Sequence, residues 1–321
     1  MKLALVYDMY DHKLRAQAWS QTYRDMLLAL IERFDQTQHI GRSCSAQDIE
    51  ADCVVFFDPH SAHVISIDGI ERHKAVKYSY INDPHQHNVS GMYIDGYMYR
   101  KRGSRNRMER ELERGVEHII CPYTEGYWAY LAPWLGKRAE SMFLWFPVAP
   151  DARRFDRHIP LVARETAVLA NGCTWPKRGP PYSFRRWAFE QSCVKFVDHF
   201  ILNNDTPCGV GYAQFLQHYA GALALCDVYV VPKYLEIPLA GCVCFAQAQG
   251  DYSRMGFVHG RNCVIVGREN FAQLIGEFLR NPDKYQQLAD AGRKQALNWT
   301  AERFADFIYN HAKERINGKS T

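Results

Sequence analysis

The chain has 321 residues, of which 47% are hydrophobic and 23% are charged, a composition typical of a globular protein and not of a disordered or fibrous one. A chain of this length exceeds one ordinary core and predicts two domains. The formal net charge of +4 tolerates an anionic ligand, but it does not by itself indicate nucleic-acid binding, which needs a clustered basic face.

No apolar run reaches the roughly 18–20 residues that span a bilayer. The apolar start at residues 1–8 is too short for a signal peptide and is typical of a first strand. The ten cysteines form no CxxC pairs, which favours buried free thiols in a reducing compartment over a disulfide framework or a zinc site. We therefore expect a cytoplasmic protein.

The first half of the chain alternates short apolar runs with segments of helical periodicity. The apolar runs, which predict strands, lie at residues 3–7, 53–57, 76–81, 118–122 and 142–148. Helical spacing of apolar residues appears over 16–34, and a shorter aromatic helix pattern appears over 127–135. This alternation indicates a doubly wound, mostly parallel sheet. Three prolines within residues 147–160 then predict a linker, so a first domain is expected over residues 1–150.

The alternation restarts after the linker and predicts a second domain over residues 151–321. Strand patterns lie at residues 166–170, 194–197, 227–231, 242–246 and 263–266. Helical patterns lie at residues 184–191, 212–225, 235–240, 271–279, 282–297 and 301–316. The fold class expected from this pattern is α/β, with two doubly wound units.

Acidic and histidine side chains directly follow several of the predicted strands of the first domain. They are Asp8, Asp58, His60, Asp83 and His85. Ligands of open parallel sheets bind beyond the carboxyl ends of the strands, so we expect these side chains to share one rim.

Four segments near the C-terminus occur in an order that resembles a known family. The first is Lys-Tyr-Leu-Glu-Ile-Pro-Leu-Ala-Gly-Cys-Val at residues 233–243, and the others lie at residues 251–262, 269–282 and 288–300. Each segment alone is a weak signal. The ordered set resembles the C-terminal domain of GT-B glycosyltransferases, and in particular the glycosyl transferase group 1 branch that includes the spore-maturation type proteins.

The resemblance implies a GT-B fold, in which two Rossmann-like domains face each other across a cleft and the last helix returns towards the first domain. It also implies a hexosyltransferase-like enzyme that moves a sugar from a nucleotide-diphosphate donor, most often a UDP-sugar, to an acceptor hydroxyl. The N-terminal half resembles the family only in its alternating pattern. No cofactor or metal is expected, and the chain has no Asp-x-Asp motif.

The donor is expected to bind to the second domain. The residues expected to bind it are Gly172, Lys177, Arg178, Lys233, Tyr234, Glu236 and Gly241. A carboxylate such as Glu236 can accept hydrogen bonds from both ribose hydroxyls, each worth roughly 1.5–3 kcal/mol. Lys233 matches a basic position of the family and is expected at the diphosphate.

Each of these residues also has a purely structural interpretation. Glu236 can offset a helix dipole, and Gly241 can end a helix. The basic residues Lys177, Arg178 and Lys233 can be solvated surface charges. Many retaining members of the family carry a second glutamate seven residues away, and because Glu236 stands alone we infer no stereochemistry.

An inverting transferase needs a general base for the acceptor hydroxyl, and aspartate or histidine can serve. Asp83 and His85 are the first candidates, and Asp58 and His60 are the second. Both pairs can instead be turn residues, since Asp-Pro commonly starts a turn. Two alternatives stay open: a metal-dependent hydrolase that uses the same Asp/His cluster, and a non-catalytic protein that binds a nucleotide sugar.

One dense basic run lies at residues 100–110, in the acceptor-side half. Arg100, Arg102 and Arg105 can hold an anionic acceptor, including a DNA base that bears a hydroxymethyl group. The alternative is a charged helix face, because glutamates intersperse the second half of the run. The sequence leaves the sugar, the acceptor and the oligomeric state open.

Overall fold

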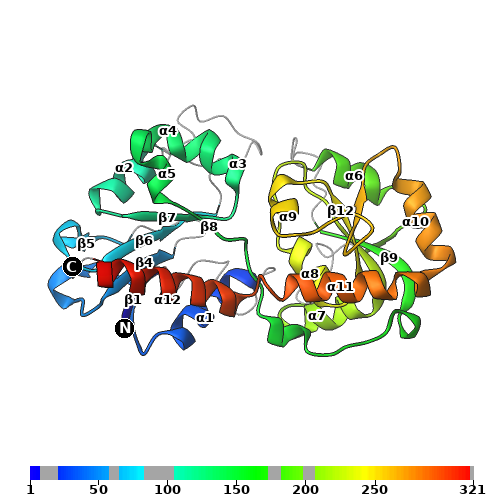
Figure 1. Cartoon of the computed structure of the whole chain (residues 1–321), viewed down its shortest axis with the longest axis horizontal. Coiled ribbons are helices and arrows are strands. Elements are labelled where there is room, and N and C mark those ends of the chain that lie inside the picture. The colour runs from blue at the N-terminus through cyan, green and yellow to red at the C-terminus, as the bar shows by residue number, and fades with distance from the viewer. Residues whose placement is uncertain (8–20, 58–64, 83–104, 173–181, 198–206, 319–321) are drawn as a thin grey trace.

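The computed structural model describes residues 1–7, 21–57, 65–82, 105–172, 182–197 and 207–318. Two large parallel sheets dominate the described part of the chain, and helices pack around both (Figure 1). The first sheet uses strands up to residue 145 and the second uses strands from residue 165 onwards. This arrangement confirms the predicted α/β class.

The first sheet has six strands in the order β2-β1-β4-β6-β7-β8, and every pairing in it is parallel. The strands are β1 (Lys2–Val6), β2 (Gln36–Ile40), β4 (Cys53–Phe57), β6 (Val76–Tyr80), β7 (His118–Cys121) and β8 (Phe143–Trp145). A small parallel pair, β3 (Cys44–Ser45) and β5 (Ile67–Asp68), lies apart from it. Every residue of β4 and β6 is buried, as expected for strands covered on both faces.

The helices of this half are short after the first. They are α1 (Thr22–Arg33), α2 (Arg105–Glu113), α3 (Thr124–Gly126), α4 (Ala132–Leu135) and α5 (Ala139–Met142), with a π-helical segment at Tyr127–Leu131 between α3 and α4. The aromatic pattern at residues 127–135 therefore forms a helical segment, as expected.

The second sheet has five strands in the order β10-β9-β11-β12-β13, again all parallel. The strands are β9 (Glu165–Asn171), β10 (Lys195–Val197), β11 (Tyr219–Ala224), β12 (Val243–Gln247) and β13 (Val264–Val266). The helices are α6 (Ser183–Phe189), α7 (Val210–Gln217), α8 (Lys233–Leu239), α9 (Gly250–Arg254), α10 (Phe271–Arg280) and α11 (Gln286–Ala296).

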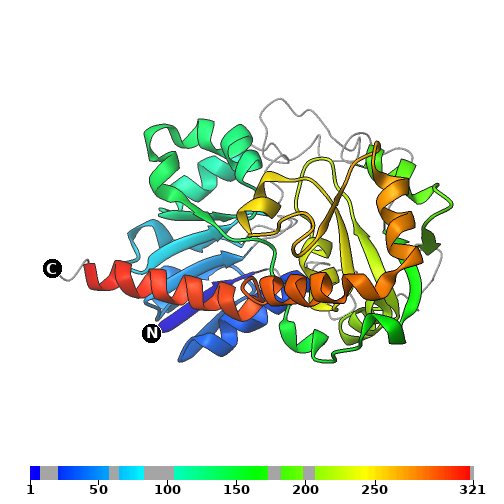
Figure 2. The ribbon, with the colours of Figure 1, turned by 45° about the vertical axis from the view of Figure 1, so that its right-hand side comes forward.

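The last helix, α12 (Ala301–Gly318), leaves the second half and runs along the first (Figures 1 and 2). Its apolar face joins the core of the first sheet, where Phe304 and Ile308 are fully buried. It packs on α1, where Arg33 forms a 2.6 Å ion pair with Asp306 and lies 3.6 Å from the ring centre of Tyr309. The C-terminal segment thus closes the core of the N-terminal unit.

The structure corrects two predicted elements of the second half. The sequence predicts a helix over residues 212–225 and a strand over 227–231, but the helix ends at Gln217 and the strand β11 precedes residue 227. Alanine-rich segments favour helix locally, and tertiary packing overrides that preference here. A Cβ at Gly221 would lie 3.0 Å from Phe245 and 3.1 Å from Phe278, so the packing of β11 against these rings favours glycine at this position.

The polar edge strand β2 also escapes the sequence analysis. Its residues, Gln-Thr-Gln-His-Ile, are mostly exposed or half-buried, and so they carry no apolar run. Backbone pairing with β1 holds this strand in place, and pairing of that kind leaves little trace in composition.

His118 on β7 lies under α12. Its ring packs against Tyr78 and meets the edge of His311, with ring centres 5.3 and 4.5 Å apart, and Tyr78 shares a 2.8 Å hydrogen bond with His311. Burial, together with the nearby His311 and Arg315, lowers the pKa of His118 to about 4 against the opposing charge of Glu117. The neutral imidazole therefore forms part of the surface on which α12 packs.

We expect acid to weaken the packing of α12 on this surface. The unfolded state binds the His118 proton near pH 6.5 and the folded state only near pH 4, so the contribution of His118 to stability is present above pH 6.5 and is lost as the pH falls towards 4. His118→Phe keeps an aromatic ring and should flatten the fall in unfolding free energy over this range by up to about 1.4 kcal/mol per pH unit. Denaturant titrations at several pH values measure it. The exposed variant His158→Phe is the control, and an unchanged slope in His118→Phe would contradict the assignment.

Candidate functional site

Lys233, the first residue of α8, lies at the centre of the second sheet's carboxyl edge. Strand order reverses between β9 and β11, and ligands of open α/β sheets bind at such a switch point. The ammonium group of Lys233 donates to the backbone and side-chain oxygens of Asn171, the last residue of β9. Burial lowers the pKa of Lys233 well below its usual value, the nearby Arg185 lowers it further, and Glu236 opposes both.

Gly172 makes this approach possible. Its φ of +118° lies where side chains other than hydrogen are strained, and a Cβ there would stand 3.0 Å from the Lys233 nitrogen. The same hypothetical Cβ would lie 3.8 Å from an Arg185 nitrogen. Arg185 is anchored from α6 by a 2.8 Å hydrogen bond to the carbonyl of Leu225. Two cations therefore converge where β9 ends.

Glu236 lies one turn further along α8 and faces the first domain. Its carboxylate accepts a 3.0 Å hydrogen bond from the hydroxyl of Thr22, at the start of α1, and lies 3.8 Å from Arg154. Arg154 also pairs with Asp25 of α1, which in addition accepts a 3.0 Å bond from the backbone of Asp151. Glu236 is only 4% exposed, so it is neither a solvated residue nor a simple partner of the helix dipole.

Burial sets the pKa values of both carboxyl groups. It raises the pKa of Asp25 to about 6, against the attraction of Arg154. It also raises the pKa of Glu236, again with Arg154 as the main opposing charge. In the ionised state, the negative charges of Asp25 and Glu236 balance the positive charges of Arg154 and Lys233, and Arg185 beside Lys233 adds one further positive charge.

Tyr234 and Gly241 have packing roles in this structure. Tyr234 is fully buried, donates a 3.2 Å hydrogen bond to the carbonyl of Gln247, and meets the edge of Tyr252. Gly241 follows α8 with a φ of +73°, and a Cβ there would stand 2.8 Å from Arg164. These contacts give both residues a structural role, and their part in donor binding stays a prediction.

The remaining predicted site residues lie outside the described residues, or their side chains do. Asp58, His60, Asp83, His85, Lys177, Arg178, Arg100 and Arg102 fall in the undescribed ranges, and for Arg105 only the start of α2 is described. Their roles stay predictions. Among the described residues, no group of three or more histidine, cysteine, aspartate or glutamate side chains can hold a metal ion.

The strands that lead into the two Asp/His segments are adjacent and point towards the second domain. Phe57 at the end of β4 pairs with Tyr80 at the end of β6. Just beyond β6, Asn82 accepts a 3.2 Å hydrogen bond from Tyr123, whose ring stacks on Tyr229 with centres 4.2 Å apart. Tyr229 belongs to the segment between β11 and α8, so this rim of the first sheet meets the second half of the chain.

A second contact joins the domains away from the charge cluster. Asp251 of α9 accepts hydrogen bonds of 2.9 and 2.6 Å from the backbone and hydroxyl of Thr124. Arg254 donates to the same hydroxyl at 3.1 Å and lies 4.2 Å from the ring centre of Trp145. The two domains are therefore fixed to each other at two separate places.

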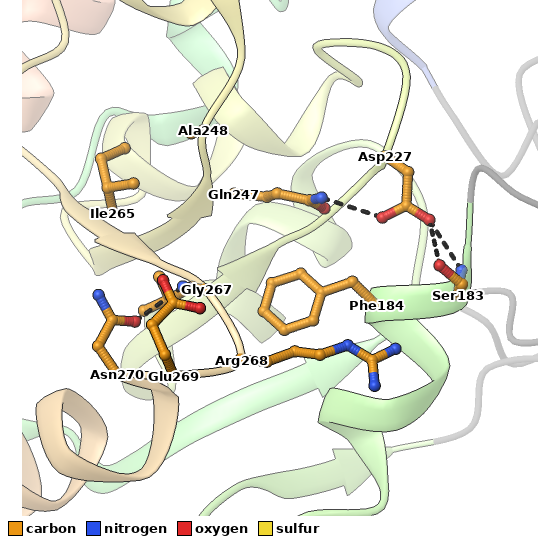
Figure 3. A pocket seen from close by; sticks show the side chains of 11 residues that line it. Ser183, Phe184, Asp227, Gln247, Ala248, Ile265, Gly267, Arg268, Glu269 and Asn270 are labelled. Carbon is orange, nitrogen blue, oxygen red and sulfur yellow. Dashed lines mark hydrogen bonds between the residues drawn. The ribbon is translucent and has the colours of Figure 1, made fainter.

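A pocket of about 430 Å³ opens at the carboxyl edge of the second sheet (Figure 3). Strand ends and the start of α6 form its walls. The lining residues are Ser183, Phe184, Asp227, Gln247, Ala248, Ile265, Val266, Gly267, Arg268, Glu269 and Asn270. Figure 3 shows Asp227 hydrogen-bonded to Gln247 on one side and Ser183 on the other. None of these residues is among the site residues predicted from the sequence.

Several other residues close to Lys233 and Glu236 are not predicted from the sequence. They are Thr22, Asp25, Arg154, Asn171 and Arg185. Asn171 carries the best local signal, because it ends a predicted strand beside a predicted loop glycine. The others lie on helices or in the linker, where a single charged or hydroxyl residue has no distinguishing pattern.

The sequence matches no protein-family model and no curated protein. Solved structures do match. Anabaena HepE in complex with UDP-glucose aligns with a TM-score of 0.59 at 11% identity, covering 98% of this chain and 100% of that chain. Sucrose-phosphate synthase from Thermosynechococcus elongatus aligns with a TM-score of 0.59 at 12% identity, covering 99% of this chain and 100% of that chain. An alpha-glucosyltransferase in complex with UDP-glucose and DNA containing an abasic site gives 0.63 at 9%, covering 99% of each chain.

At these identities the likeness establishes the fold and not the reaction. It extends over nearly the whole of this chain and of each of the three structures. No helix among the described residues is long and apolar enough to cross a membrane. Assignment to the spore-maturation branch stays a prediction. The chain has the GT-B glycosyltransferase fold, as the ordered C-terminal segments indicate.

Proposed function

We propose that the protein is a glycosyltransferase that moves a sugar from a UDP-sugar to an acceptor hydroxyl. The observation that carries the proposal is the half-buried side chain of Lys233, fixed by Asn171 against Gly172 at the switch point of the second sheet. The likeness in fold to two structures that contain UDP-glucose supports a UDP-sugar as the donor.

Lys233 and Arg185 would hold the donor diphosphate. Two converging cations in a buried site attract a dianion, and they stabilise the negative charge that develops on the leaving UDP. Glu236 would accept hydrogen bonds from the ribose. A carboxylate has about four acceptor positions, so its bond with Thr22 leaves capacity for ribose hydroxyls. Lys177 and Arg178, in the segment after Gly172, are further candidates for phosphate contacts.

The first domain would supply the acceptor and the general base. Asp83 and His85 remain the first candidates, with Asp58 and His60 second, because each pair follows a strand whose end meets the donor-side domain. The nine cysteines that the structure describes are free thiols, most of them buried, which supports a reducing compartment such as the cytoplasm.

A DNA acceptor is the second candidate. The observation that favours it is the basic run of residues 100–107, with Arg100, Arg102 and Arg105, in a chain whose fold resembles an alpha-glucosyltransferase bound to DNA. A hydroxymethylated base would present the required hydroxyl. Neutralising the three arginines should then raise the acceptor KM in a salt-sensitive manner.

Transfer itself is tested with a panel of nucleotide sugars and of acceptors, including hydroxymethylated DNA, with released UDP as the readout. We expect transfer from a UDP-sugar in the presence of EDTA, because cationic side chains replace a metal at the diphosphate. Loss of activity with EDTA that a divalent ion restores would favour the metal-dependent hydrolase. UDP-sugar binding without transfer or hydrolysis would favour the non-catalytic binding protein.

Donor binding should be linked to the protonation of Lys233. Its pKa is lowered in the free protein, and a bound diphosphate favours the charged form, so the pKa rises on binding. Affinity for UDP should therefore fall as the pH rises through the lowered pKa, and binding there should take up a proton. Calorimetry in buffers of different ionisation enthalpy measures this uptake.

Lys233→Met should abolish the proton uptake and weaken UDP binding roughly ten- to hundredfold, the value of a charged hydrogen bond. Glu236→Gln keeps the size of the side chain and is the matched variant. It should weaken UDP binding and leave the proton uptake in place. Proton uptake that persists in Lys233→Met would remove this lysine from the diphosphate site.

The general base should act on turnover and not on donor affinity. Asp83→Asn or His85→Gln should lower kcat by roughly 10²–10⁴-fold if that residue accepts the acceptor proton. The Kd for UDP should barely change, because the other domain holds the donor. Equal losses of UDP affinity and turnover would show that residues 83–87 belong to the donor site instead.

A further inference from the structure

The pocket in Figure 3 adjoins the proposed diphosphate site through helix α6. Arg185 binds the carbonyl of Leu225, and one half-turn earlier the backbone and hydroxyl of Ser183 donate to Asp227 at 3.0 and 2.8 Å. The first turn of α6 therefore holds the segment from Leu225 to Asp227 on both sides. The cations lie at one end of this short segment and the pocket lies at the other.

The polar wall of the pocket presents hydrogen-bond acceptors. The amide nitrogen of Gln247 donates to Asp227 at 3.0 Å, which leaves the amide oxygen of Gln247 as the free end of that side chain. Within the described residues this oxygen is buried and has no hydrogen-bond partner. Partial burial raises the pKa of Asp227, but hydrogen bonds from Gln247 and Ser183 outweigh it and hold the pKa below its usual value. A carboxylate and an amide oxygen thus stand side by side.

Such a wall suits a sugar better than a nucleobase. Each sugar hydroxyl can donate to an acceptor oxygen, whereas uracil has a single N–H donor flanked by two carbonyl oxygens that a carboxylate repels. A base is also held by stacking on an exposed aromatic face, and Phe184, the aromatic residue of this pocket, is only 6% exposed. The volume of about 430 Å³ is within the range of small-molecule sites and accommodates a hexose.

We propose that this pocket receives the sugar of the donor, and that Asp227 and Gln247 select which sugar is accepted. The inference rests on the proposed function, because it places the sugar one bond beyond the diphosphate at Lys233 and Arg185. Asp227 and Gln247 would then accept hydrogen bonds from the hydroxyl groups of the sugar. Sites built to hydrogen-bond a substrate hydroxyl discriminate strongly against analogues that lack or displace it.

The test compares UDP with UDP-glucose, UDP-galactose and UDP-N-acetylglucosamine on the full chain. Gln247→Leu replaces the amide side chain with an apolar one. Its Kd for UDP should equal that of the wild type. Its affinity for the preferred UDP-sugar should fall roughly tenfold, and the kcat/KM ratio between the sugars should shrink. Asp227→Asn should act in the same direction.

Gln191→Leu is the matched control, because the Gln191 amide also donates to a neighbour, the carbonyl of Trp187 at 2.8 Å, but lies outside the pocket. It should leave every affinity and ratio unchanged. A folded Gln247→Leu that loses UDP and UDP-sugar affinity by the same factor would overturn the proposal and make the pocket a nucleotide subsite. Unchanged sugar selectivity would also overturn it. Failure of the proposed function appears differently, as a wild-type protein that binds no UDP.

Discussion

The buried charge cluster of Lys233, Glu236, Arg154 and Asp25 is the interaction on which the arrangement of the two domains depends. Taking ionised groups out of water is costly, and the cost is met only when each charge has an opposite partner and hydrogen bonds. Here the partners come from α8, the linker and α1, which belong to different parts of the chain. Moving one domain would leave uncompensated buried charge, so the cluster fixes where α1 stands relative to α8.

The other interdomain contacts are consistent with a defined relative position. Asp251 accepts two hydrogen bonds from Thr124 at some distance from the cluster, and α12 returns from the second half to complete the core of the first. A helix that belongs in sequence to one domain and in packing to the other couples their stabilities. The cluster also contains the residues proposed to bind the donor, so ligand binding and domain position share the same buried charges.

The geometry around Gly172 links backbone conformation to chemistry. A positive φ and the absence of a Cβ allow the Lys233 ammonium to approach the end of β9, and the approach brings it close to Arg185. Two positive charges so close repel each other, and hydrogen bonds from Lys233 to Asn171 and from Arg185 to the carbonyl of Leu225 hold the two side chains in place. These hydrogen bonds would pre-organise the proposed diphosphate site.

The sequence by itself determined the α/β class and most strands of the two sheets, and it singled out Lys233 and Glu236 as candidate site residues, because apolar periodicity and an ordered set of motifs are local signals. It did not determine β11, whose three alanines favour helix until packing of the segment against Phe245 and Phe278 selects a strand. Only the tertiary structure decided which residues surround Lys233 and Glu236, among them Arg154, Arg185 and Thr22. The physical reason is that the partner of a buried charge is set by proximity in three dimensions. Residues 21–33, 151–156 and 233–240 are far apart in the sequence, so the sequence alone does not show that their charges pair.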